Sequence, residues 1–171
     1  MDNSLVAYMV KLEVMAFFSG YPLIYSIALF TAGNLSAKWK VKYRIVSLLP
    51  FAYALVGALF LGFQLKKLFP DYSGENMNHA IQQSYLIIWG LLALLFWIPA
   101  LSKKPIFSLI HSLVFFFLLL KDLFLQLFSP AADNSIIAND MKVYAASLVL
   151  NLVALAFLVL LSSIYSFYKK R

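Results

Sequence analysis

The chain has 171 residues and a formal net charge of +7, with 14 Lys and Arg against seven Asp and Glu. Hydrophobic residues make up 63% of the chain, charged residues make up 12%, and the mean hydropathy is +0.85, whereas a soluble domain is about half apolar and about a quarter charged. This composition excludes an ordinary water-soluble domain, and the lack of cysteine excludes disulfide bonds and thiolate metal sites.

The apolar residues form five stretches that are each long enough to cross a hydrocarbon core, which takes about 20 helical residues. They show no alternation with a period of two, and backbone polar groups in lipid must be paired within each segment, so helices are expected rather than a β-barrel. We therefore predict an all-α integral membrane protein, a single domain over residues 1–171 formed by a bundle of five transmembrane helices. The predicted helices are 14–35, 45–65, 81–101, 106–128 and 143–167.

The first stretch contains the sequence FFSGYPLIY, which predicts a kinked helix. Pro22 cannot donate a hydrogen bond to the carbonyl of Phe18, and Gly20 lowers the local rigidity. Two interpretations are open. The kink is either a packing device whose backbone groups are paired by neighbouring helices, or part of an ion or substrate site that uses Tyr21 and Tyr25.

Two charges, Lys11 and Glu13, interrupt the apolar run just before this stretch. If the helix begins as early as Leu5, its first turns project from the outer face of the membrane or lie along it. Both charges are then expected at the outer interface, where ionised groups cost little.

The loop after the first stretch, SAKWKVKYR, carries Lys38, Lys40, Lys42 and Arg44. Together with the Lys103–Lys104 link and the C-terminal residues 169–171, it holds nine basic residues and no acid, whereas the rest of the chain holds five basic residues and all seven acids. The positive-inside rule places these three segments in the cytoplasm, which predicts an outside N-terminus and a cytoplasmic C-terminus. The alternative is that this loop contacts an anionic lipid or an acidic partner.

The second stretch has small residues at four-residue spacing, Ala54, Ala58 and Gly62, with Gly57 beside them. Small residues at this spacing let two helix backbones approach closely. We expect a helix-packing face here, used either inside this chain or against another subunit.

The fourth stretch follows the third after the short link SKKP, so the two are expected to be antiparallel neighbours. Taking 100° per residue, six of its residues, four of them polar, fall on one stripe. The stripe consists of Ser108, His111, Phe115, Leu118, Asp122 and Gln126. Lys121 and Asp122 lie deep enough to need protein, water or a partner charge. Two interpretations of these charges are open, interhelical pairing and a transport path, and pairing needs fewer assumptions. Examples of such pairs are Asp122 with Lys11 or Lys142, and Lys121 with Glu13.

Asn151 lies in the fifth stretch at a depth similar to that of Asp122, with Ser147 one turn away. An amide at this depth more often joins helices than binds a ligand. We expect Asn151 and Ser147 to form one polar seam between helices.

The sequence shows no nucleotide-binding, metal-binding or nucleophile pattern, so we expect no cofactor, no enzymatic activity and no nucleic-acid partner. We expect an accessory or scaffold subunit of a larger membrane complex, in contact with the lipid bilayer and with other subunits or with itself. The alternative is a small oligomeric transporter or ion-conducting protein that uses the kinked first helix and the polar face of the fourth. The small size and the lack of a targeting segment favour a bacterial cytoplasmic membrane.

Overall fold

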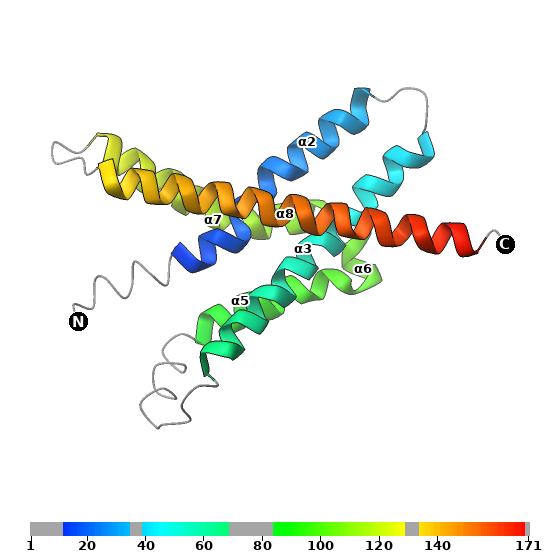
Figure 1. Ribbon diagram of the computed structural model, residues 1–171, viewed down its shortest axis with the longest axis horizontal. Coiled ribbons are helices and arrows are strands. Elements are labelled where there is room, and N and C mark those ends of the chain that lie inside the picture. Colours follow the sequence, from blue (N-terminus) through cyan, green and yellow to red (C-terminus); the bar gives the residue numbers. More distant parts are fainter. Residues whose placement is uncertain (1–11, 35–38, 69–83, 129–133, 170–171) are drawn as a thin grey trace.

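The structure is a computed structural model that describes residues 12–34, 39–68, 84–128 and 134–169 (Figure 1). All regular elements in these ranges are helices, which confirms the all-α prediction. After a helical segment at 12–18, the elements are α2 (Tyr21–Asn34), α3 (Trp39–Leu68), α5 (Ser84–Leu94), the 3-10 helix η1 (Leu95–Trp97), α6 (Pro99–Ser102), α7 (Ile106–Leu127) and α8 (Asn134–Tyr168).

Four helices of the described chain are long and apolar enough to cross a membrane. They are Leu12–Thr31, Ile45–Lys66, Ile106–Leu127 and Ile137–Tyr168, with lengths of 20, 22, 22 and 32 residues. A multi-pass helical membrane protein is therefore supported, and the count of five crossings stays a prediction.

The third predicted helix, 81–101, is broken in the structure. Its apolar part is the shorter helix Tyr85–Trp97, after which Ile98 is extended at φ −70° and ψ 127° and Pro99 begins α6. The cause is local, because the proline ring disfavours the helical region for the residue before it, while proline itself suits the first position of a helix.

Two helix starts also differ from the prediction. The helix α3 begins at Trp39, so Lys40, Lys42 and Arg44 lie in its first two turns rather than in a loop. The helix α8 begins at Asn134 rather than near Val143. In both cases polar residues extend an apolar helix beyond its hydrophobic run, which hydropathy does not detect.

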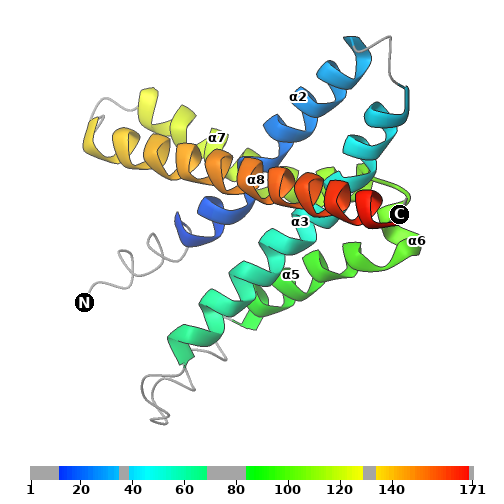
Figure 2. The same ribbon diagram turned by 45° about the vertical axis from the view of Figure 1, so that its right-hand side comes forward.

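The helix α3 lies at the centre of the fold and contacts α2, α5 and α8. Figures 1 and 2 show α5 running beside α3, whereas α8 crosses it. The buried core is mostly aromatic and aliphatic side chains around this centre, with Phe18, Tyr53, Phe60 and Leu49 fully enclosed.

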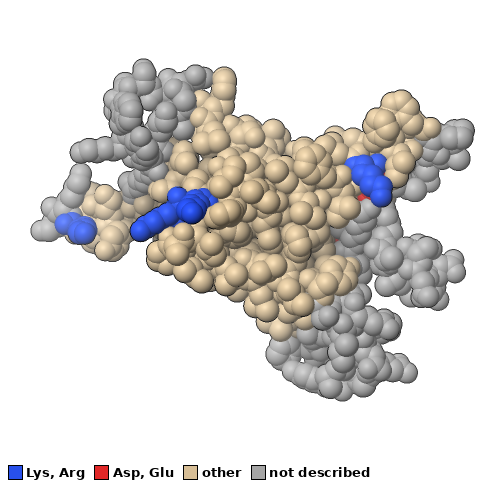
Figure 3. Space-filling view, turned by 180° about the vertical axis from the view of Figure 1, so that it is seen from behind, with Lys and Arg blue, Asp and Glu red and all other residues tan. Residues whose placement is uncertain are grey.

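Successive helices alternate in direction. In Figure 1 the end of α2, the start of α3, the short α6 and the end of α8 lie towards the right, and the end of α3, the start of α5, the end of α7 and the start of α8 lie towards the left. On the face shown in Figure 3, Lys and Arg appear towards the two ends and a charge-free band separates them. Such a band is what the hydrocarbon core of a bilayer requires.

Candidate functional site

His111 lies inside an aromatic cluster at the centre of the fold, formed by rings from five segments of the chain. The cluster consists of Phe18, Tyr53, Trp89, Phe96, His111 and Phe115. The imidazole stacks on the Trp89 indole with a centroid distance of 4.2 Å and an interplanar angle of 28°. Offset stacking of this kind fixes the ring plane of the histidine.

One hydrogen bond links the histidine to α3. The Tyr53 hydroxyl lies 2.6 Å from His111 Nδ1, and which of the two groups donates depends on the histidine tautomer. The other nitrogen, Nε2, is buried without a hydrogen-bond partner among the described residues, as is Nε1 of the neighbouring Trp89. The arrangement holds the imidazole by packing and by one hydrogen bond.

Beside the cluster, Tyr21 joins α2 to the start of α7. Its hydroxyl lies 2.8 Å from Ser108 Oγ, and Ser108 Oγ lies 2.7 Å from the carbonyl oxygen of Pro105, to which it donates. Because that carbonyl can only accept, the Ser108 proton is used there, and the Tyr21 hydroxyl must donate to Ser108. Pro22 is buried next to it, and the Tyr25 ring lies 6.0 Å from that of Tyr21.

The first long helix is interrupted where the sequence contains FFSGYP. A turn at Ser19 and Gly20 separates the helical residues 12–18 from α2, so Pro22 falls in the first turn of α2. The Gly20 N–H donates to Ser147 Oγ of α8 over 2.9 Å. Asn151 Nδ2 donates to the Phe17 carbonyl over 2.8 Å and to the Ser147 carbonyl over 2.8 Å. Two side chains of α8 therefore bind backbone groups that the break leaves without helical partners.

Gly20 is also the point of closest approach between these two helices. A Cβ atom added there would lie 2.6 Å from the backbone nitrogen of Leu148 and 2.7 Å from the carbonyl carbon of Ser147. Since both neighbours are backbone atoms, no side-chain movement would relieve the overlap. Glycine is therefore required at this position by packing.

The charged residues of α7 lie away from the aromatic cluster. Lys121 is exposed and Asp122 is half-buried, eleven residues beyond His111, which is about 16 Å along a helix. At the same end of α7, Gln126 Nε2 donates to Oδ2 of the buried Asp140 of α8 over 3.4 Å. The structure thus does not bring His111 and Asp122 together.

Of the remaining charges named from sequence, Glu13 is half-buried in the first helix, and Lys11, an expected partner of Asp122, lies outside the described residues. Lys38 also lies outside them.

The close contact of α3 occurs at Gly57 rather than at Gly62. A Cβ at Gly57 would lie 2.6 Å from Cβ of Ala93 in α5, whereas a Cβ at Gly62 would have no atom within 4 Å. Of the other two small residues, Ala54 is fully buried and Ala58 is half-buried. The small residues of α3 therefore serve packing inside this chain at Gly57 and leave Gly62 open.

Within the described ranges, no three His, Asp or Glu side chains are placed to share a metal ion. Comparison with protein-family models, curated proteins and solved structures finds no match to this chain. The role of the polar groups must therefore be inferred from their geometry.

Three residues that contact the predicted polar groups are not indicated by the sequence: Tyr53, Trp89 and Asp140. Tyr53 and Trp89 resemble any aromatic residue in an apolar run, and no local pattern shows that they meet His111. Asp140 lies before the fifth predicted helix, 143–167, because hydropathy rises only near Val143. The signal that could have found it is its spacing from Tyr144 and Ser147, which continues the helical period of α8 towards the N-terminus.

Proposed function

We propose that this protein is a non-catalytic accessory or scaffold subunit of a larger membrane complex. The observation that supports it best is the use of the polar groups within the fold. Ser147 and Asn151 bind the interrupted first helix, Tyr21 binds Ser108, and Gln126 binds Asp140. Polar residues used in this way join helices to one another rather than lining a path for a solute.

The outer helices support the same proposal. In the apolar windows of the α7 and α8 spans 22% of residues are buried, against 56% and 50% in the first two long helices. Large apolar side chains such as Phe117, Phe124, Val149 and Leu160 are exposed along them. In a bilayer these faces contact lipid or the helices of another subunit.

The proposal includes five crossings, an outside N-terminus and a cytoplasmic C-terminus in a bacterial cytoplasmic membrane. This part of the proposal is supported by the placement of the three basic segments towards the same end of the fold. The start of α3, the Lys103–Lys104 link and the end of α8 lie towards one end of the fold, as an alternating chain that crosses an odd number of times requires (Figure 1).

Purification from native membranes in a mild detergent tests this proposal. We expect a companion chain at fixed stoichiometry, identified by mass spectrometry and retained through size-exclusion chromatography. As a matched pair, Phe117→Ala at the exposed middle of α7 should weaken retention of the companion, and Phe107→Ala, exposed at the start of the same helix, should not. Recovery of the chain by itself in every mild detergent would contradict the proposal.

A small oligomeric transporter or ion-conducting protein is the second candidate. Nε2 of His111 favours it, since this buried atom has no hydrogen-bond partner among the described residues, and a histidine with a free nitrogen can exchange a proton. Liposomes containing the protein should then show an ion flux that Asp122→Asn or His111→Phe abolishes. Absence of flux in the wild type would remove this candidate.

A further inference from the structure

The outer surface of α7 carries one cation among large apolar side chains. Taking 100° per residue, five exposed residues fall within an arc of about 80°. These residues, here called the outer α7 face, are Ile110, Val114, Phe117, Lys121 and Phe124. Phe117 is 60% exposed and Phe124 is 61% exposed, so this face is turned away from the rest of the described fold.

Lys121 lies inside the membrane-spanning part of α7. It is six residues, or about 9 Å of helix, from the last residue of the span Ile106–Leu127. The span has 22 residues, about 33 Å of helix, so little of it extends beyond a hydrocarbon core of about 30 Å. An ammonium group at this depth needs protein, water or an opposite charge beside it, unless the lysine chain extends to the interface.

The three acids that the structure describes are not on the outer α7 face. Asp122 is half-buried and lies about 100° further round the helix than Lys121. Asp140 is buried and accepts a hydrogen bond from Gln126. Glu13 is half-buried in the first helix. An opposite charge for Lys121 on this face therefore has to come from outside the described residues.

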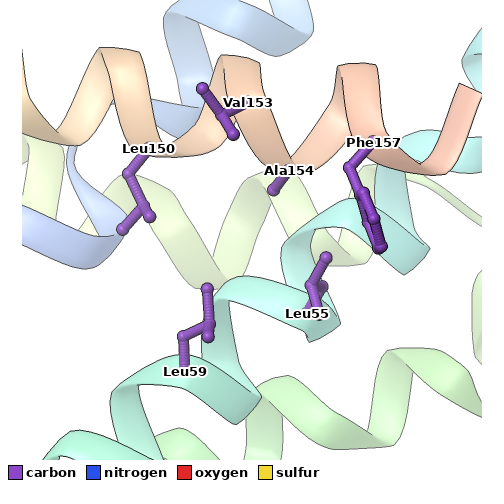
Figure 4. A pocket seen from close by; sticks show the side chains of 6 residues that line it. All are labelled: Leu55, Leu59, Leu150, Val153, Ala154 and Phe157. Atoms are coloured by element: carbon purple, nitrogen blue, oxygen red, sulfur yellow. The ribbon is translucent and has the colours of Figure 1, made fainter. Parts of the chain in front are cut away.

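The groove between α3 and α8 differs from this face in charge (Figure 4). Its lining is apolar throughout, so lipid alone can cover it. The lining residues are Leu55, Leu59, Leu150, Val153, Ala154 and Phe157. The outer α7 face requires more of its occupant, because Lys121 adds a charge to an otherwise apolar surface.

A second copy of this chain does not meet that requirement. Two copies in one membrane share their orientation, and a two-fold contact through this face places the same patch of each copy against the other. Lys121 would then lie against Lys121 of the second copy, and like charges placed together disfavour the contact.

We propose that the outer α7 face binds a transmembrane helix of another protein that carries one Asp or Glu at the depth of Lys121. Apolar side chains of that helix pack on Ile110, Val114, Phe117 and Phe124, and its carboxylate pairs with the ammonium group. This inference rests on the proposed function, because it names the chemistry of the companion's contact.

Defined peptides test the proposal without the natural companion. The probes are leucine-rich transmembrane peptides of the length of α7 that differ only in one residue, Asp, Leu or Lys, six residues from one end. The full chain, labelled with a donor dye through Asn139→Cys near the start of α8, is placed in phosphatidylcholine vesicles with each acceptor-labelled peptide. Energy transfer should show the Asp peptide binding about tenfold more tightly than the Leu peptide.

Variants of the cation identify the contact. Lys121→Leu should bind the Asp and Leu peptides equally, and Lys121→Glu should prefer the Lys peptide. Lys142→Leu removes an exposed cation of α8 and should leave the preference for Asp unchanged. Because Lys121 is exposed, its variants leave the packed core intact, and circular dichroism checks their helix content.

The apolar part of the face has its own matched pair. Phe117→Ala should weaken the binding of both the Asp and the Leu peptide several-fold. Val153→Ala should not, although Val153 is 58% exposed in the α3–α8 groove.

Equal binding of the three peptides by the wild type would overturn the inference, and so would a preference for Asp that survives Lys121→Leu. Pairing of two wild-type copies that blocks the peptides would also overturn it and identify a second copy as the occupant. A companion chain that co-purifies equally with Lys121→Leu and with the wild type would overturn the inference and leave the proposed function standing. Absence of any companion would instead contradict the proposed function.

Discussion

The backbone N–H of Gly20 donates a hydrogen bond to the hydroxyl of Ser147, so that the last long helix caps a break in the first. A proline-induced break in a transmembrane helix leaves backbone groups that lipid cannot bind. Here α8 supplies an acceptor through Ser147 and a donor through Asn151. The break is thus part of the helix interface, and its residues can be tested through stability.

The first prediction concerns space at Gly20. Gly20→Ala places a methyl group 2.6 Å from the Leu148 nitrogen, so it should separate the two helices and cost about 1–3 kcal/mol of unfolding free energy. Gly62→Ala is the matched control, because its added methyl group meets no atom within 4 Å. Thermal unfolding in detergent should show a lower Tm for the first variant and an unchanged or slightly raised Tm for the second. Equal Tm values would contradict the packing described at Gly20.

The second prediction concerns the polar seam. Ser147→Ala removes the acceptor of the Gly20 N–H, and Asn151→Leu removes the donor to the Phe17 carbonyl. Each should lower the unfolding free energy by about 0.6 kcal/mol, the mean for hydrogen bonds between membrane helices, and by no more than about 1.7 kcal/mol, the largest value. Ser163→Ala is the control, because Ser163 donates to the Val159 carbonyl of its own helix and is exposed. If the control cost as much as Ser147→Ala, the seam would not join the helices.

The third prediction concerns the pair formed by Tyr53 and His111. Tyr53→Phe and His111→Phe each remove the 2.6 Å hydrogen bond and keep a ring in the cluster. In a double-mutant cycle we expect a coupling of about 0.6 kcal/mol or more, measured by unfolding in mixed micelles. Tyr165→Phe, at a 70% exposed site on α8, should show no coupling with His111→Phe. Additive effects of the first pair would mean that the hydrogen bond adds no stability.

The fourth prediction concerns sidedness. The chain has no cysteine, so a single introduced cysteine is a unique label site. Lys104→Cys, in the exposed link before α7, should react with an impermeant maleimide from the cytoplasmic side only. Asn139→Cys, exposed near the start of α8, should react from the outside only. Labelling of both from one side would contradict the proposed topology.

Much of the fold could be predicted because hydropathy along the sequence reflects the length of each apolar helix and its exposure to lipid. The four long helices follow from apolar runs that exceed the membrane thickness. The break near Pro22 could be placed because proline lacks the N–H that a helix needs. Pro99 has the same chemistry, yet the predicted helix 81–101 runs past it, because an apolar run does not reveal that Ile98 is extended.

The contacts of the polar residues could not be predicted, because they depend on which helices meet. The pairing of Ser147 with Gly20 joins residues 127 positions apart, and that of Tyr53 with His111 joins residues 58 apart. A polar stripe shows which face of a helix is polar, but it does not show which other helix that face contacts. The small residues of α3 are an example. The four-residue spacing of Ala58 and Gly62 does not show that Gly57 is the residue that packs against Ala93.

The cap on the first helix also constrains biosynthesis. Ser147 leaves the ribosome 127 residues after Gly20, a delay of about 6–25 s at a synthesis rate of 5–20 residues per second. Throughout that interval the turn at Ser19 and Gly20 lacks the hydroxyl that later binds it. This cap can therefore form only after α8 has been synthesised.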